Sequence, residues 1–129
     1  MSNINKVNIA QKMALFSEHW SPKIVGELDN YHIKAVKFVG DFVWHHHEDT
    51  DEMFLVIDGS FTMKLRDGDI HIQQGEFIII PKGVEHRPVA EEQVDIMLFE
   101  PASTHNTGDN LKSQLSQEKI ELLETQDKI

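Results

Sequence analysis

The sequence predicts an all-β protein: a single antiparallel β-barrel or jelly roll with a short N-terminal arm and a polar C-terminal tail. In the middle of the chain, short apolar or alternating segments follow one another between turn signals. These signals recur at short intervals, at Asp58-Gly59, Asp67-Gly68, Gly75-Glu76 and Lys82-Gly83. Short strands punctuated in this way are typical of sandwiches and barrels. A length of 129 residues suits one domain.

The chain divides by composition into three parts, an N-terminal arm at 1–22, the barrel at 23–101, and a loop and tail at 102–129. In the arm, Ile9, Met13 and Phe16 form a helical stripe without strong caps, so a short helix and an extended arm are both open. Early barrel strands are expected at 23–27, 32–39 and 42–46, with turns at Asp29-Asn30 and Gly40-Asp41 between them.

Alternation identifies the next strands, because residues two apart in a strand share one face. Phe61, Met63 and Leu65 form one apolar face, and Ile70 with Ile72 forms another. The run Ile78-Ile79-Ile80 is continuously apolar, which predicts a central strand covered on both faces. A last strand at 94–99 closes the barrel.

After Pro101 the chain becomes polar, which predicts a loop over residues 103–110 that either covers one end of the barrel or leaves it. Residues 111–129 are expected to form a peripheral tail. One short helix is predicted at 117–125 with Ser116 as its N-cap, and it is expected to fray because helices of this length are marginal without a packing partner.

Histidines in the run Trp44-His45-His46-His47 carry the first functional signal. Strand alternation places His45 and His47 on one face together with Val43, and Phe42, Trp44 and His46 on the other. A second cluster supplies His86 after an apolar strand and the turn Pro81-Lys82-Gly83. Imidazole and carboxylate are the ligands that iron, manganese, nickel and zinc accept, and the chain has no Cys to compete. The alternative is a solvated, His-rich loop beside Glu48, Asp49 and Asp51.

These two clusters resemble the two motifs of the cupin superfamily. Gly40, His45, His47, Glu52 and Gly59 match the first motif, with four residues rather than five between Gly40 and His45. Gly75, Pro81, Gly83 and His86 match the second, with Ala90 where Asn is usual. The resemblance implies a small single-domain cupin that holds one divalent transition metal (Fe, Mn, Ni or Zn) through His45, His47, Glu52 and His86. Asp49 and Asp51 lie close to Glu52, and the motif spacing favours Glu52.

Metal-bearing cupins include dioxygenases, sugar isomerases, epimerases, lyases and decarboxylases, so the resemblance implies a small organic ligand without fixing the reaction. The leading hypothesis is a metalloenzyme of the isomerase, epimerase or dioxygenase type acting on a sugar-like or oxygen-rich molecule. The metal would act as a Lewis acid, and Glu52 would double as a catalytic acid or base. A non-catalytic ligand sensor or carrier, and a purely structural metal, are the alternatives.

Residues that surround a ligand are harder to identify, because each candidate fits the barrel core equally well. The apolar candidates for a pocket wall are Val43, Phe54, Val56, Met63, Phe77, Ile79 and Phe99. His46 is assigned no metal role because it faces away from its neighbours. The remaining histidines, His19, His32, His71 and His105, stand alone in the sequence and are assigned none either.

Charge and hydropathy restrict the partners. The net charge of −10 and the scattered distribution of 12 Lys and Arg argue against nucleic acid and anionic membranes. No apolar run approaches the roughly 18 residues of a membrane span, and the first residues lack a secretory signal, so a soluble, cytoplasmic protein is expected. The resemblance implies a homodimer, for which the face carrying Phe42 and Trp44, together with the arm, would supply the surface.

Overall fold

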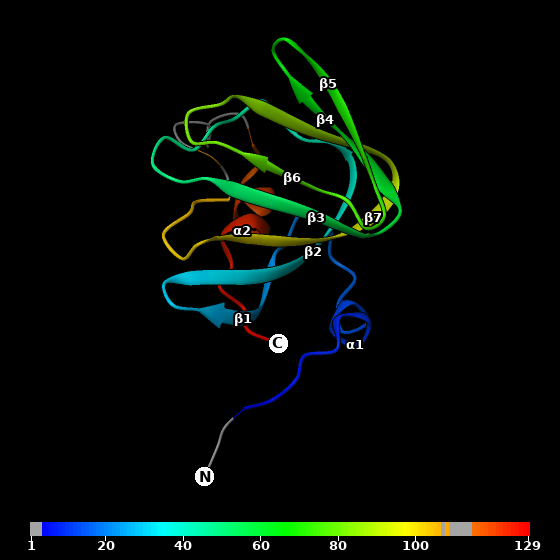
Figure 1. Ribbon diagram of the computed structural model, residues 1–129, viewed down its shortest axis with the longest axis vertical. Coiled ribbons are helices and arrows are strands. Elements are labelled where there is room, and N and C mark those ends of the chain that lie inside the picture. The colour runs from blue at the N-terminus through cyan, green and yellow to red at the C-terminus, as the bar shows by residue number, and fades with distance from the viewer. Residues whose placement is uncertain (1–3, 107, 109–114) are drawn as a thin grey trace.

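The structure is a computed structural model that describes residues 4–106, 108 and 115–129. A short helix, α1 (Ile9–Met13), precedes the strands, and a second helix, α2 (Gln117–Glu124), follows them. The strands are β1 (Lys23–Leu28), β2 (Tyr31–Asp41), β3 (Glu52–Asp58), β4 (Ser60–Leu65), β5 (Gly68–Gln73), β6 (Phe77–Ile80) and β7 (His86–Pro101). All named strands pair antiparallel and the helices are few and short, which confirms the predicted antiparallel β fold (Figure 1).

The long strand β7 organises the sheet. It pairs with β2 along most of its length, while its C-terminal half also pairs with β3 and its N-terminal half with β4. The strand order is β1-β2-β7-β3-β6, with the β4–β5 hairpin joined to β7. Because β7 belongs to both arrangements, the sheet wraps around one main core.

Aromatic side chains fill this core. Phe38 lies 6.5 Å from Phe54 and 6.0 Å from Phe61 between ring centroids, in tilted and edge-to-face geometry. Phe61 and Met63 are buried while their neighbour Thr62 is half-buried, as the alternation in β4 predicts. The predicted pattern fails in β5, where Ile72 is buried but Ile70 is 44% exposed.

Predicted turns are found at the ends of β3, β4, β5 and β6. Gly59, between β3 and β4, has a φ of 90°, a value that L side chains rarely adopt. A Cβ there would also lie 3.1 Å from the carbonyl oxygen of Gln93, so the position accepts a larger residue poorly for two reasons.

The predicted turn at Gly40-Asp41 and the predicted strand at 42–46 are both wrong. β2 continues through Asp41 with a register shift between Phe38 and Gly40, and the next ten residues are irregular except for one bridge at His45. Strand alternation therefore does not apply to Phe42. Its side chain is 4% exposed and lies in the core, 5.0 Å from Trp20 between ring centroids. Phe42 thus offers no surface for a partner subunit.

The strand β6 lies at the edge of the sheet, which overturns the prediction of a central strand. Only β3 pairs with it among the named strands, and Phe77 and Ile79 are 61% and 54% exposed. Ile80 points inward and is buried. An apolar run of this length is compatible with either position, and the sequence alone does not distinguish a covered face from an exposed one.

Both flanking segments pack against the barrel. The N-terminal arm, for which the sequence left a helix and an extended segment open, forms the helix α1. The Asn8 side chain caps it by accepting a hydrogen bond from the Gln11 backbone N–H at 2.9 Å. α2 begins after its predicted cap Ser116. The prediction of a peripheral tail is wrong for the described residues, because Leu123 is 4% exposed within the main core cluster and the Ile129 N–H bonds to the Ile24 carbonyl. In Figure 1, α2 is seen behind β3 and the C-terminal part of β7.

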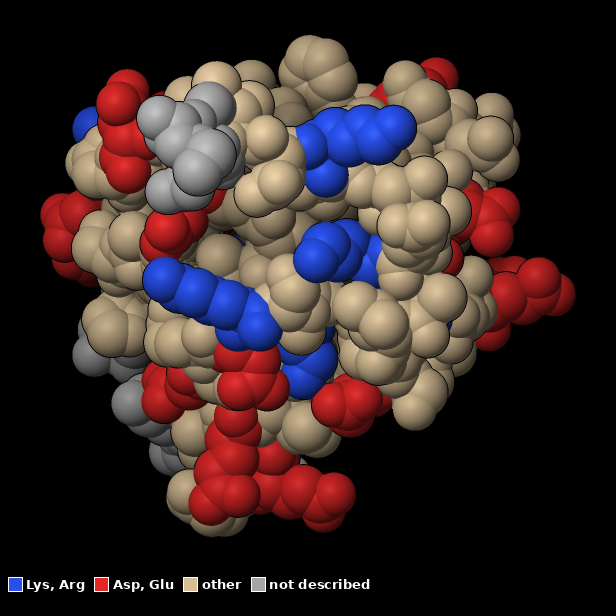
Figure 2. All heavy atoms as spheres, turned by 90° about the horizontal axis from the view of Figure 1, so that it is seen from below, with Lys and Arg blue, Asp and Glu red and all other residues tan. Residues whose placement is uncertain are grey.

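Figure 2 shows one face of the molecule, on which Lys and Arg side chains lie toward the middle, separated by uncharged side chains, with acidic side chains around the margin. Neither helix in the described part of the chain has the length and apolar character needed to cross a membrane.

Candidate metal centre

A backbone bridge brings the two histidine clusters together. The His45 N–H donates to the His86 carbonyl at 3.0 Å, and the His86 N–H donates back to the His45 carbonyl at 2.9 Å. A further hydrogen bond, from the Gly83 N–H to the His47 carbonyl at 2.8 Å, fixes the segment next to the turn after β6. Glu52 is the first residue of β3 and pairs with Ile80 of β6. Residues far apart in the sequence therefore share one inner wall.

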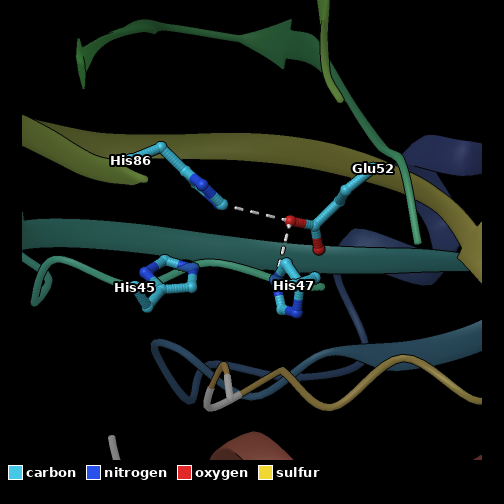
Figure 3. A group of neighbouring side chains, drawn as sticks. All are labelled: His45, His47, Glu52 and His86. Atoms are coloured by element: carbon cyan, nitrogen blue, oxygen red, sulfur yellow. Dashed lines mark ion pairs between the residues drawn. The ribbon is translucent and has the colours of Figure 1, made fainter. Parts of the chain in front are cut away.

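The four side chains converge as the two motifs predict. One ligand atom from each of His45, His47, Glu52 and His86 lies within 4.8 Å of all the others. Glu52 Oε1 is 3.4 Å from His47 Nε2 and 3.6 Å from His86 Nε2, and all four residues are at most 5% exposed. Figure 3 shows Glu52 between His86 and His47, with His45 beside them.

Backbone carbonyls orient two of the rings. His45 Nδ1 donates to the Val43 carbonyl and His86 Nδ1 donates to the Val84 carbonyl, each at 2.9 Å. Since a carbonyl can only accept, Nδ1 carries the proton and Nε2 keeps its lone pair for the cluster. His86 Nε2 is buried and has no hydrogen-bond partner among the residues that the structure describes. It faces a carboxylate oxygen, which is also an acceptor, so neither atom can donate a hydrogen bond to the other. A divalent cation would bind the lone pairs of both atoms. The residues present therefore fit a metal ion.

The protonation states also suit a cation. Burial, together with the nearby His86, lowers the pKa of His45 to about 3, so its imidazole is neutral at physiological pH. Burial alone would raise the pKa of Glu52, but the contacts with Glu100, His47 and His86 outweigh it and hold the pKa well below its usual range. Neutral imidazole and ionised carboxylate are the forms that bind metals.

A buried ion pair lies next to Glu52, and the sequence analysis did not predict it. Lys34 of β2 and Glu100 of β7 are both 0% exposed, with Lys34 Nζ 2.9 Å from Glu100 Oε1. Burial and the negative charge of Glu52 raise the pKa of Glu100 well above its usual range, while the Lys34 ammonium group acts in the opposite direction and stabilises the ionised carboxylate. A signal was present, because Lys34 shares strand parity with the core residue Val36, and Glu100 shares it with Leu98.

The backbone of Gly108 closes the site on the side of His45. An ideal Cβ at this glycine would lie 2.6 Å from His45 Cβ and 3.0 Å from its ring atom Cδ2. The φ of 77° at this position is also one that favours glycine. Residue 108 therefore packs directly against one of the four clustered side chains.

Other candidates lie outside the cluster. Asp51 and Asp49 are exposed, and Asp51 accepts a hydrogen bond from the Lys82 N–H at 2.9 Å, so Glu52 alone of the three enters the site. His46 turns toward Glu48 at 3.5 Å. The isolated histidines are also elsewhere, with His19 near Gln93, His32 near Glu27, His71 near Thr62, and His105 exposed.

A small cavity of about 30 Å³ adjoins the cluster. Its walls include the aromatic residues Trp20, Phe38, Phe42 and Phe54, and its polar lining side chains are His45, Glu52 and Asn106. Of the predicted wall residues only Phe54 lines this cavity. Val56 and Met63 belong to the core, Val43 is half-buried, Phe77 and Ile79 face outward, and Phe99 stacks on Tyr31. Trp20, Asn106 and Leu123 enter from outside the predicted barrel and had no sequence signal.

The low pKa of His45 predicts that the metal-free protein loses stability as the pH falls. An unfolded His45 takes up a proton near its ordinary pKa of 6.5, whereas the folded one resists until about 3. The contribution of His45 to the free energy of unfolding is therefore fully present above pH 6.5 and declines as the pH falls below this value. Denaturant unfolding between pH 7 and about 5, above the range in which most carboxylates titrate, measures the slope. A His45→Gln variant should show a shallower slope, and an identical slope would contradict the assignment.

Comparison with known proteins agrees with this site. Residues 37–108 match the model of the Cupin_2 family, a cupin domain, and this range contains all four clustered residues. The crystal structure of a cupin-2 domain containing protein from Shewanella frigidimarina is 48% identical, with a TM-score of 0.73 over 74% of this chain and 93% of that one.

Two curated relatives match over shorter stretches. The uncharacterized protein YdbB of Bacillus subtilis is 31% identical over 64 residues, which is 49% of this chain and 57% of that protein. An acireductone dioxygenase of a Sulfurihydrogenibium species is 48% identical over 46 residues, or 33% of this chain and 25% of the dioxygenase. The chain thus spans only part of the length of these relatives. The matched family model, the shared fold and the two motifs together show that the chain belongs to the Cupin_2 family.

Proposed function

We propose that the protein is a metal-dependent enzyme that holds one divalent transition metal ion through His45, His47, Glu52 and His86 and acts on a small, oxygen-rich molecule. The observation that carries this proposal is the buried convergence of four donor atoms within 4.8 Å of one another. Three nitrogens and one oxygen are fewer than the six donors of an octahedral ion, and catalytic sites leave positions for water or substrate in this way.

A metal held there would polarise an oxygen atom of the substrate and stabilise negative charge on it. The chain supplies the orientation. Carbonyls of Val43 and Val84 orient two imidazoles, and Glu100, which pairs with Lys34, lies beside Glu52 and helps to keep its pKa low. The low pKa of Glu52 supports its role as a ligand more than the additional role as a catalytic acid or base, because a strongly ionised carboxylate is a weak base.

The cavity favours a dioxygenase over a sugar isomerase. Sugar hydroxyls need many hydrogen-bonding partners, whereas the polar side chains in this lining are His45, Glu52 and Asn106, beside four aromatic rings. Such a lining suits a flat molecule with one or two oxygen functions, such as an enediol or a phenol. The partial similarity to an acireductone dioxygenase supports the same choice.

A non-catalytic ligand-binding or sensor protein is the second candidate. It is favoured by the cavity volume of about 30 Å³, which is small for a substrate molecule. In that case the metal would bind an oxygen of the ligand without turnover, and the aromatic wall would supply affinity.

The test begins with untagged protein loaded separately with Fe²⁺, Mn²⁺, Ni²⁺ and Zn²⁺ under anaerobic conditions. We expect one metal ion per chain, and oxygen uptake with an enediol or phenol but not with aldoses. His47→Ala should lose the metal, whereas the matched control His46→Ala, one residue away and outside the cluster, should retain it. Saturable ligand binding without conversion would favour the sensor, and metal-dependent folding without ligand binding would leave a structural ion.

A further inference from the structure

The cavity beside the metal centre has a wall that comes from outside the family domain. Leu123 of α2 lines the cavity, whereas the match to the cupin domain ends at residue 108. Leu123 is 4% exposed and belongs to the same core cluster as Trp20 and Phe42. The ammonium group of Lys119, one turn earlier, lies 5.1 Å and 5.3 Å from the ring centroids of Trp20 and Phe42. The helix is thus attached to the aromatic side of the cavity.

Asn106, which follows β7 inside the matched range, also lines the cavity, and the nitrogen of its amide is already hydrogen-bonded. Its Nδ2 donates to the Leu123 carbonyl at 3.2 Å, which ties residue 106 to α2. Because a carbonyl can only accept, the amide nitrogen of Asn106 must face Leu123. The amide oxygen Oδ1 is then the atom that points away from this bond. Oδ1 is buried and has no hydrogen-bond partner in the described part of the chain, and the residue as a whole is 8% exposed.

A buried acceptor without a partner is rare in native structures and calls for a donor, which a water molecule or a group of a bound ligand can supply. Asn106 lines the same cavity as His45 and Glu52, so a donor that satisfies Oδ1 would be part of a molecule next to the metal. The donor would have to be an O–H or N–H group, since Oδ1 only accepts.

The size of the cavity sets a second condition. About 30 Å³ holds only about two water molecules. A ligand of more than a few atoms therefore needs more room than this, and Leu123 is the lining side chain that α2 contributes. The short helix that carries it depends on packing for its stability, so its displacement costs less than a change in the barrel.

We propose that Asn106 and Leu123 are specificity-determining residues of the metal pocket. Asn106 Oδ1 accepts a hydrogen bond from an O–H or N–H of a metal-bound ligand, and Leu123 limits the size of that ligand. This inference rests on the proposed function, because it assumes a metal ion at His45, His47, Glu52 and His86. It assigns the selection of the ligand to the segment that follows the barrel.

Two small hydroxamates test the proposal by calorimetry on metal-loaded protein. Acetohydroxamate and N-methylacetohydroxamate chelate a metal through the same two oxygens, but only the first has an N–H donor. The wild type should prefer acetohydroxamate by about tenfold, as expected for one hydrogen bond. Asn106→Leu, close to isosteric, should reduce this ratio to the smaller preference that the size of the methyl group alone produces. Leu123→Ala should raise the affinity for the larger N-methyl compound most.

Controls separate recognition from structure. If Asn106 only ties the tail to Leu123, its replacement will weaken both hydroxamates equally, and the unchanged ratio would overturn the proposal. Asn106→Ala is the second variant in case leucine disturbs folding. Thr104→Val removes another buried polar group two residues away, outside this cavity, and should leave the ratio unchanged.

The two proposals fail in different ways. A wild type that binds one metal ion but neither hydroxamate, or both with equal affinity, would refute the recognition role and leave the metal function intact. A wild type that binds no metal would refute both. In Leu123→Ala, unchanged affinity for the N-methyl compound would show that Leu123 does not limit ligand size.

Discussion

His86→Ala is expected to abolish stoichiometric metal binding. His86 is fully buried, and its Nε2 lies 3.6 Å from Glu52 Oε1 in the centre of the cluster. Even replacement of groups that merely support a ligand costs about 10- to 100-fold in metal affinity, so loss of a ligand should cost at least about 100-fold. Competition with a chelator of known affinity measures the change. Metal-induced thermal stabilisation should disappear in parallel, because only a bound ion stabilises the folded state.

His71→Ala is the control for this experiment. His71 lies on β5, bonds to Thr62 at 3.1 Å and has no place in the cluster, so its variant should bind metal like the wild type. Retention of one tightly bound ion by His86→Ala would contradict the four-residue site. Loss of metal in both variants would point to a general effect on folding instead.

Lys34→Met is expected to destabilise the protein by about 3–5 kcal/mol, the typical cost of leaving one partner of a buried ion pair behind. Lys34 Nζ lies 2.9 Å from Glu100 Oε1, with both residues 0% exposed. Removing the cation leaves Glu100 and Glu52 as adjacent buried carboxyl groups. Chemical denaturation of the metal-free protein measures the loss of stability.

The double variant Lys34→Met with Glu100→Leu separates stability from metal binding. Replacing both charges by apolar side chains should recover most of the lost stability, since such replacements of buried pairs are often neutral. Metal affinity should stay reduced, by about 10- to 100-fold, because Glu52 has lost the group that positions it. Full recovery of both quantities would show that the pair contributes nothing to the metal centre.

Local chemistry made the fold and the cluster predictable. Positive φ at Gly59 and Gly83 follows from turn chemistry, and the spacing of His45, His47, Glu52 and His86 follows from the motifs. The convergence does not depend on the regular strand that the sequence predicts at 42–46. The backbone bridge between His45 and His86, the hydrogen bond from Gly83 to His47 and the pairing of Glu52 with β6 produce it instead.

Features that depend on tertiary packing were not predictable in the same way. An apolar run does not reveal whether its neighbours lie on one side or two, and β6 turned out to be an edge strand. Leu123 has no recognisable partner in the local sequence, since Trp20 is about a hundred residues away in the chain, yet both belong to one core cluster. In the sequence, Lys34 and Glu100 are two charged residues at positions that face the core. Each alone contradicts the alternation of the strand, and only their contact in the structure explains both.

The contact between Gly108 and His45 limits how this metal centre can be transferred to a smaller protein. A minimal scaffold cut after β7 at Pro101 would keep all four ligand residues but lose the backbone that packs against one imidazole. Evolutionary or designed insertions near position 108 face the same restriction, because any side chain there competes with His45 for space. The smallest unit that keeps the metal centre intact is therefore the sheet together with the turn after β7 that ends at Gly108.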